Sequence, residues 1–203
     1  MKIILKIKIL IKILIIISCS SHPSLADRIS LNKISDYING LTTLQADFEQ
    51  INSDGSIDRG KLYIRRPGRM RLEYTAPNNA LVIAGAGSVA IFDDKSKNGP
   101  TLFPLKKTPL NLLLKKNVDL SKNEMITEHT ANNENTFIVA KDPKRKSQGS
   151  IKMVFSNSPV SLQGWTITNQ SNQKTKIILD KLDKKTKIPL YLFNISAASK
   201  NKN

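Results

Sequence analysis

The chain has 203 residues, 39% of them hydrophobic, so it is long enough for one ordinary domain and too apolar for disorder to be the default. Its formal net charge of +16 would usually indicate nucleic acid or an anionic membrane, but the excess is mostly Lys spread along the chain. A single Cys, Cys19, excludes an intramolecular disulfide and a multi-cysteine metal site.

The first 26 residues have the features of an export signal. A start with four Lys precedes the apolar run at residues 13–17, and Ser24-Leu25-Ala26 fits the small-x-small cleavage pattern. The apolar run is too short and too interrupted by Lys to span a membrane. We therefore expect a signal peptide over residues 1–26 and a single mature domain over residues 27–203. Export from the cytoplasm argues against nucleic acid as a partner.

A second interpretation of this region concerns Cys19. Ile16-Ile17-Ser18-Cys19 loosely fits a lipobox, in which Cys19 would be lipidated and become the mature N-terminus. The short apolar run suits this alternative, whereas Ser24-Leu25-Ala26 suits simple secretion. The cleavage pattern favours the soluble product, and both alternatives place the mature protein outside the cytoplasm.

The mature chain begins with one helical pattern and continues with strand patterns. Leu31, Ile34, Ile38 and Leu41 recur at helical spacing, with Asp27 near the start and Gly40 as a stop signal. Short alternating runs punctuated by turn signals then predict about a dozen strands at hairpin spacing. This pattern indicates an antiparallel sheet that curls into a barrel or a sandwich. The predicted strands cover residues 44–51, 60–66, 70–74, 81–84, 89–93, 101–105, 125–129, 136–140, 150–155, 162–168, 175–180 and 189–193.

One short helical pattern interrupts the strands at residues 108–116. Thr108 occupies an N-cap position, Pro109 the first helical position, and Lys residues follow at the end. The helix would be nearly encircled by four leucines, which are Leu110, Leu112, Leu113 and Leu114. Such a helix must be buried on more than one side, as expected for a plug or lid over the concave face of a sheet.

An arginine-rich stretch at residues 65–74 combines a turn with an alternating strand. Pro67 holds Arg66 extended and, with Gly68, predicts a turn or the start of a strand. Beyond the turn, one strand face would carry Arg69, Arg71 and Glu73, and the other Met70, Leu72 and Tyr74. The pattern alone is consistent with a solvated strand face or with a functional guanidinium cluster.

The sequence offers little chemistry for catalysis. Of the two His, His22 lies in the predicted signal and His129 stands alone on a strand, without metal partners. Asp93-Asp94 has no matching acid or base, and no phosphate loop or nucleophile elbow is present in the sequence. We predict no catalytic residues, no metal site and no cofactor, which argues against a hydrolase on a β scaffold. Trp165 is expected to be a core anchor.

A series of residues along the mature chain, in the same order as in the family, resembles the LolA family of outer-membrane lipoprotein carriers. The arginine–proline segment and Pro77 are the most specific part of this resemblance, which spans roughly residues 31–193. The matching residues are Phe48-x-Gln50, Gly60-x-Leu62-x-Ile64, Arg66-Pro67-Gly68-Arg69-Met70-Arg71-Leu72-Glu73-Tyr74, Pro77, Leu81-Val82-Ile83, Gly87, Thr108-Pro109-Leu110, Leu112-Leu113-Leu114, Gly164-Trp165-Thr166 and Leu190-x-Leu192-Phe193.

The resemblance implies a mainly β fold, a half-open and strongly curved antiparallel barrel, with an N-terminal helix and short lid helices over a concave apolar cavity. It implies a monomeric carrier in the periplasm that binds the acyl chains of lipoproteins. The partners would be an inner-membrane ABC-type lipoprotein release complex and an outer-membrane lipoprotein acceptor. If Cys19 is lipidated, the alternative is an outer-membrane-anchored acceptor of the same fold.

The resemblance also implies roles for individual residues. Arg66 matches the arginine that hydrogen-bonds lid carbonyls and holds the empty cavity shut, with Pro67 beside it in this lid latch. A guanidinium suits the task because its fixed donors can bind more than one carbonyl. Cavity or lid residues would be Phe48, Met70, Leu72, Tyr74, Pro109, Leu110, Leu112, Leu113 and Leu114. Two departures are Leu72, where the family often has an aromatic residue, and a short polar tail after Phe193.

Overall fold

The computed structural model describes residues 28–93, 99–122, 124–141 and 149–202. These residues form one antiparallel sheet of eleven strands, in the order β6-β5-β4-β3-β2-β1-β11-β10-β9-β8-β7. The predicted signal and Cys19 lie outside the described residues. The strands are β1 Thr43–Ile51, β2 Ile57–Arg65, β3 Arg69–Tyr74, β4 Leu81–Gly85, β5 Ser88–Phe92, β6 Thr101–Pro104, β7 Ile126–Ala131, β8 Asn135–Lys141, β9 Ser150–Asn157, β10 Val160–Thr168 and β11 Lys174–Asp183.

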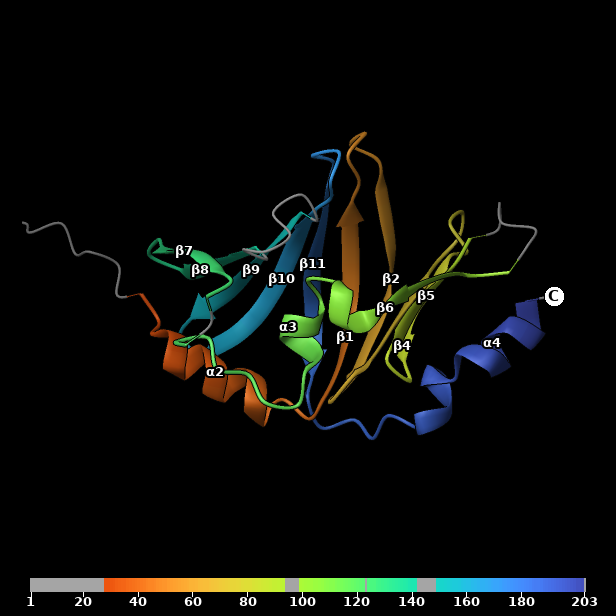
Figure 1. Cartoon of the computed structure of the whole chain (residues 1–203), viewed down its shortest axis with the longest axis horizontal. Coiled ribbons are helices and arrows are strands. Elements are labelled where there is room, and N and C mark those ends of the chain that lie inside the picture. The colour runs from red at the N-terminus through yellow and green to blue at the C-terminus, as the bar shows by residue number, and fades with distance from the viewer. Residues whose placement is uncertain (1–27, 94–98, 123, 142–148, 203) are drawn as a thin grey trace, which may run out of the picture.

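The sheet is strongly curved and does not close. Its first strand, β1, lies in the middle and pairs with β2 on one side and β11 on the other, while β6 and β7 are the two edges. Figure 1 shows the two halves of the sheet diverging from β1 and β11, with α2 (Leu31–Gly40) and α3 (Asn111–Leu114) in front of them. The expectation of a mainly β, half-open antiparallel fold with short helices is confirmed.

Alternation along the strands defines a concave and a convex face. In β2, Leu62 and Ile64 are fully buried on the concave face, whereas Lys61 is exposed on the convex face. The same alternation in β1, β3, β9 and β11 turns the apolar side chains inward. The main hydrophobic core therefore fills the concave side, between the sheet and the helices.

Helix α2 covers one end of this concave side. Ser30 is its N-cap, and the Ser30 side chain accepts a hydrogen bond from the backbone N–H of Lys33 at 3.3 Å. Ile34 and Ile38 are fully buried, which confirms the amphipathic helix that the spacing predicted. Asp27, which was expected near the start of the helix, lies outside the described residues.

Eleven of the predicted strands are present, and the prediction of a strand at residues 189–193 is wrong. That run forms a short 3-10 helix, η3 (Leu190–Phe193), followed by α4 (Ile195–Lys202). Its apolar residues pack on the convex face instead of pairing with a strand. They join a second apolar cluster made by Leu81, Ile83, Ala90, Phe92, Ile188 and Phe193. The prediction of Trp165 as a core anchor is confirmed, because only 2% of its surface is exposed.

Two arginines of the arginine-rich stretch hold this C-terminal segment. Arg65 Nη1 donates to the carbonyl of Ile188 at 2.6 Å, and Arg71 Nη1 donates to the carbonyl of Leu192 at 2.9 Å. Arg71 Nε also pairs with Glu73 Oε1 at 2.5 Å. The pattern allowed a solvated strand face for this stretch, and the structure instead engages Arg65 and Arg71 with the chain itself.

We expect Arg71→Ala to loosen the C-terminal segment without unfolding the sheet. The Arg71 side chain is 16% exposed and joins β3 to η3, so its loss should cost about 1.5–3 kcal/mol, the usual value for a hydrogen bond to a charged group. Amide hydrogen exchange should rise in η3 and α4 and stay unchanged in β9 and β10. Arg69→Ala is the control, since the hydrogen bond of the Arg69 guanidinium among the described residues goes to the Pro67 carbonyl and not to this segment. Uniformly faster exchange along the chain would contradict the local role.

Candidate functional site: a helical lid held by Arg66

A helical segment after β6 returns across the concave face. This lid segment (Leu105–Lys116) contains the 3-10 helix η1 (Leu105–Lys107) and the short helix α3 (Asn111–Leu114). The predicted helix at residues 108–116 is therefore present but shorter. Thr108 is not its cap: the Thr108 hydroxyl donates to the Leu105 carbonyl at 2.8 Å and closes η1, and Leu110 holds the cap position of α3.

The predicted leucines of the lid segment all pack inward. Leu113 and Leu114 are fully buried, and Leu110 and Leu112 are 6% and 4% exposed. These side chains belong to the same core cluster as the concave residues of β1 to β3. Pro109 is half-buried beside them. A four-residue helix cannot be stable alone, so packing of these leucines against the sheet holds it in place.

The guanidinium of Arg66 lies between the ends of the two helices. Its Nη1 donates to the carbonyls of Ile38 and, at 3.4 Å, Leu41 at the end of α2. Its Nη2 donates at 2.7 Å to the carbonyl of Lys115 and at 3.4 Å to that of Lys116, just after α3. The last carbonyls of a helix lack partners within the helix and carry a partial negative charge. One cation thus satisfies both helix ends.

The turn that carries Arg66 also binds the lid directly. The peptide bond from Arg66 to Pro67 is cis, Gly68 has a φ of +74°, and the Gly68 N–H donates to the Leu114 carbonyl at 2.8 Å. Burial lowers the pKa of Arg66, but a guanidinium stays charged throughout the ordinary pH range. Its Nε is buried and has no partner among the described residues. The hairpin between β2 and β3 is therefore tied to the lid by side chain and backbone together.

The predicted concave residues lie under and beyond the lid. Met70 and Phe48 are each 2% exposed and Leu72 is 6% exposed. Phe48 and Tyr74 stack edge to face with ring centroids 5.1 Å apart. All of them, with the lid leucines, form one contiguous core cluster. The concave side under the lid is therefore filled by the protein's own side chains.

Beyond the lid, the concave face opens into a pocket of about 600 Å³. Figure 1 shows the upper parts of β1 and β2 extending past α3. The apolar wall contains Tyr74, Val82 and Ile91, and the Tyr74 hydroxyl donates to Gln50 Oε1 at 2.6 Å. Burial raises the pKa of Tyr74, so the hydroxyl remains protonated. Gln50 was part of the recognised pattern, but its contact with Tyr74 could not be predicted from spacing.

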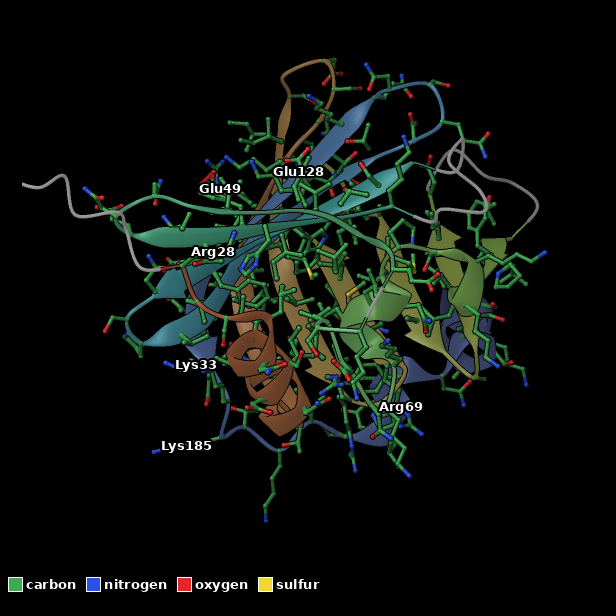
Figure 2. All side chains as sticks on the ribbon, turned by 60° about the vertical axis from the view of Figure 1, so that its left-hand side comes forward. Arg28, Lys33, Glu49, Arg69, Glu128 and Lys185 are labelled. Atoms are coloured by element: carbon green, nitrogen blue, oxygen red, sulfur yellow. The ribbon has the colours of Figure 1, made fainter. Side chains whose placement is uncertain are left out.

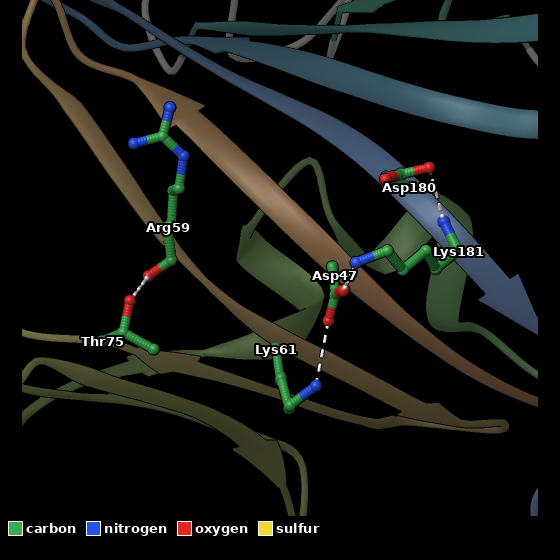
Figure 3. Close-up of polar contacts among 6 residues, drawn as sticks. All are labelled: Asp47, Arg59, Lys61, Thr75, Asp180 and Lys181. Atoms are coloured by element: carbon green, nitrogen blue, oxygen red, sulfur yellow. Dashed lines mark hydrogen bonds and ion pairs between the residues drawn. The ribbon is translucent and has the colours of Figure 1, made fainter.

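On the convex face, charged side chains of β1, β2 and β11 form ion pairs. Asp47 on β1 accepts hydrogen bonds from Lys61 on β2 and Lys181 of β11, each at 3.0 Å (Figure 3). The bonds to Lys61 and Lys181 lower the pKa of Asp47. Arg69 instead lies at the edge of the molecule and points outward (Figure 2), with one bond to the Pro67 carbonyl at 3.2 Å. Exposed ion pairs such as those of Asp47 with Lys61 and Lys181 add little to stability.

The described residues contain no group of three or more His, Cys, Asp or Glu side chains that could hold a metal ion. Over the same residues, no helix is both long and apolar enough to cross a membrane. His129 lies on the edge strand β7, with Nε2 2.8 Å from the Ile29 carbonyl. Burial is the main cause that lowers the pKa of His129. Its contact connects the sheet edge to the start of α2.

Comparisons with known proteins show which family has this sequence pattern and fold. The family model described as outer membrane lipoprotein carrier protein LolA matches residues 39–196. An uncharacterized protein of Rickettsia prowazekii (strain Madrid E) is 28% identical over 92% of this chain and 86% of its own length. An outer-membrane lipoprotein carrier protein of Chromohalobacter salexigens is 24% identical over 74% of this chain and 75% of its own.

A solved structure, a putative outer membrane lipoprotein-sorting protein domain from Vibrio parahaemolyticus, shares the fold. It covers 83% of this chain and 97% of its own, with a TM-score of 0.52 and 11% identity. The family model covers most of the described residues, including both strands that flank Arg66 and the whole lid segment. The chain therefore belongs to the LolA family of outer-membrane lipoprotein carrier proteins.

Proposed function

We propose that the protein is a periplasmic carrier for the acyl chains of lipoproteins. It would take them from an ABC-type release complex in the inner membrane and pass them, as a monomer, to an acceptor in the outer membrane. Residues 1–26 would be the export signal. Family membership supports this proposal, and so does one observation, the contact of Arg66 with both helix ends over an apolar core.

The physical need for such a carrier follows from the cost of exposing acyl chains to water. Each exposed methylene costs about 0.8 kcal/mol, so a triacylated N-terminus left in water costs on the order of tens of kcal/mol. A concave sheet with a movable lid can cover those chains without a membrane. The core leucines of the lid would exchange contacts with Met70 and Leu72 for contacts with the acyl chains.

Arg66 would set the energy of the empty, closed state. Its bonds to the carbonyls of Ile38 in the last turn of α2 and Lys115 just after α3 must break when the lid moves away from α2, so closing the lid helps to expel the cargo. A carrier that used no latch would bind its cargo more tightly and release it more slowly. We assign this latch to Arg66 and the positioning of its backbone to Pro67.

The proposal is tested by acyl binding and by cargo capture. The purified protein should bind a fluorescent fatty-acid analogue with a stoichiometry near one, and a lipoprotein should co-purify with it when the release complex is present. A lipoprotein from which the acyl chains have been removed is the matched control and should not co-purify. If the protein binds neither the analogue nor the acylated lipoprotein, it is not a carrier.

The second candidate is an outer-membrane acceptor of the same fold, anchored through a lipid on Cys19. It is favoured by the sequence Ile16-Ile17-Ser18-Cys19 alone. Intact-mass measurement of the protein from its host separates the two: a mature chain that begins at Asp27 supports the carrier. A diacylglyceryl Cys19 at the N-terminus supports the acceptor.

A further inference from the structure

The edge strand β6 displays apolar side chains on both of its faces. All four residues of Thr101–Pro104 are exposed, with Leu102 at 59% and Phe103 at 45% exposure. Leu102 is opposite Ala90 and Phe103 opposite Val89, so the two side chains project to opposite sides of the sheet. Two large apolar side chains therefore meet water side by side along the strand, one on each side of this edge of the sheet.

Lysines follow this edge directly. Lys106 and Lys107, both exposed, form the last turn of η1, and Lys115 and Lys116 come at the end of the lid segment. Residues 99–118 contain these four Lys and no acidic residue. Among the described residues, no acidic side chain forms an ion pair with Lys106 or Lys107, in contrast to Lys61 and Lys181 on the convex face.

The free edge of β6 is poorly suited to pairing with another strand. The strand has four residues, and Pro104 lacks an N–H, so few donors are available along the edge. An added strand would also leave the two lysines without a role. A surface with large apolar side chains and adjacent uncompensated lysines instead matches the interface of an anionic bilayer, where apolar groups enter the headgroup region and lysines remain at the phosphates.

We propose that residues 101–107, the docking segment, bind the surface of an anionic phospholipid bilayer. Leu102 and Phe103 insert at the interface, and Lys106 and Lys107 contact lipid phosphates. The docking segment overlaps the start of the lid segment at η1 (Leu105–Lys107), and the Thr108 N–H donates to the Leu105 carbonyl at 2.9 Å. Docking therefore places the membrane next to the movable part of the protein. The four exposed side chains of this surface lie outside the concave core, to which Leu105 belongs, and the proposal goes beyond the carrier function proposed above.

Lysine replacement tests the electrostatic part. Co-sedimentation is measured with vesicles of phosphatidylcholine alone and of phosphatidylcholine with phosphatidylglycerol, using the protein purified from its host. Binding should require phosphatidylglycerol and weaken with salt. The double variant Lys106→Gln/Lys107→Gln should bind roughly 30-fold more weakly, as expected for two lysines at an anionic surface. The matched control is Lys174→Gln/Lys176→Gln on β11, which removes the same charge from exposed positions of the convex face.

A fluorescence variant tests the apolar part. Trp165 is 2% exposed and gives a constant background, so Phe103→Trp adds one reporter at the docking segment. Its emission should shift to the blue on addition of phosphatidylglycerol vesicles. Ile178→Trp on the convex face, where Ile178 is 39% exposed, should not shift. A hydrophobic environment reached by both reporters, or by neither, would overturn the proposal.

The other possible outcomes of these two experiments also decide whether the proposal holds. Equal loss of vesicle binding in both lysine pairs would mean that only net charge matters, and binding to a purified protein partner but not to lipid would mean that the edge is a protein interface. Each overturns the proposal. Binding to neutral vesicles by every variant would also overturn the proposal, because neither the anionic lipid nor Lys106 and Lys107 would then determine binding. If the protein binds the fatty-acid analogue but no vesicles, the docking proposal is wrong and the carrier proposal is unaffected.

Discussion

Arg66→Leu should produce a protein whose lid opens readily and whose cargo is not handed on. The substitution removes the hydrogen bonds from the guanidinium to the carbonyls of Ile38 and Lys115 and leaves two helix ends without their cation. Hydrogen bonds to charged groups are worth about 1.5–3 kcal/mol each. Because the site is half-exposed, we expect a combined loss of about 3 kcal/mol, or roughly 150-fold in the ratio of closed to open lid.

The open state has measurable consequences. Fatty-acid analogues should bind Arg66→Leu more tightly, lipoprotein should remain with it in the presence of the acceptor, and amide exchange should rise at Leu113 and Leu114. Thermal unfolding by circular dichroism checks that the sheet still forms. If Arg66→Leu passes cargo to the acceptor at the rate of the unchanged protein, Arg66 is not the latch.

Two variants separate geometry from charge. Arg66→Lys keeps the charge but presents a compact ammonium group on a flexible stem, so it can reach one helix end and not bridge both. We expect it to behave between the unchanged protein and Arg66→Leu. Arg69→Leu removes an arginine from the same hairpin, and among the described residues the Arg69 guanidinium donates one hydrogen bond, to the Pro67 carbonyl at 3.2 Å. That variant should bind and release cargo normally.

Much of the fold could be predicted because the signals are local. Alternation such as Leu62-Tyr63-Ile64 determines which side of a strand faces the core, and turn residues separate the strands. Burial of the lid leucines could also be predicted, because a helix with leucines on most sides has to be buried. These properties depend on neighbours within a few residues, so a single sequence carries them.

The contacts that matter for the site are not local. Arg66 binds backbone carbonyls 28 and 49 positions away, at Ile38 and Lys115, and a carbonyl has no side chain that a pattern could reveal. Only resemblance to the family pointed to that contact. The prediction of a strand at residues 189–193 was wrong for a related reason. Its alternating apolar residues look like a strand, but a distant apolar strip that includes Leu81 and Ile83 on the convex face had to be covered.

The curvature of the sheet depends on irregular positions that alternation does not reveal. The register of β10 against β9 shifts between Leu162 and Gly164, which is a β-bulge, and a second shift occurs in β1 against β11 between Gln45 and Asp47. Bulges bend a strand and increase its twist. The concave face that receives the lid thus owes part of its shape to one glycine next to the buried Trp165.

Gly164→Ala should therefore be strongly destabilising. Gly164 has a φ of +152°, a backbone angle that residues with a side chain rarely adopt. A Cβ at this position would overlap the Ile177 carbonyl of β11. The neighbour is backbone within a ladder and cannot rotate away, so β10 would have to separate from β11 or lose its bend. We expect a loss of about 3 kcal/mol or more in the free energy of unfolding, from backbone strain together with lost pairing.

Chemical denaturation monitored through Trp165 measures this loss, because the indole follows the residue that changes. The matched control is Gly40→Ala at the end of α2, where a Cβ would meet no atom within 4 Å. Alanine favours helix more than glycine does, so Gly40→Ala should be neutral or stabilise the protein by up to about 1 kcal/mol. A Gly164→Ala protein as stable as Gly40→Ala would mean that the bend of β10 tolerates a side chain, and that the curvature of the concave face is maintained by the helices packed inside it.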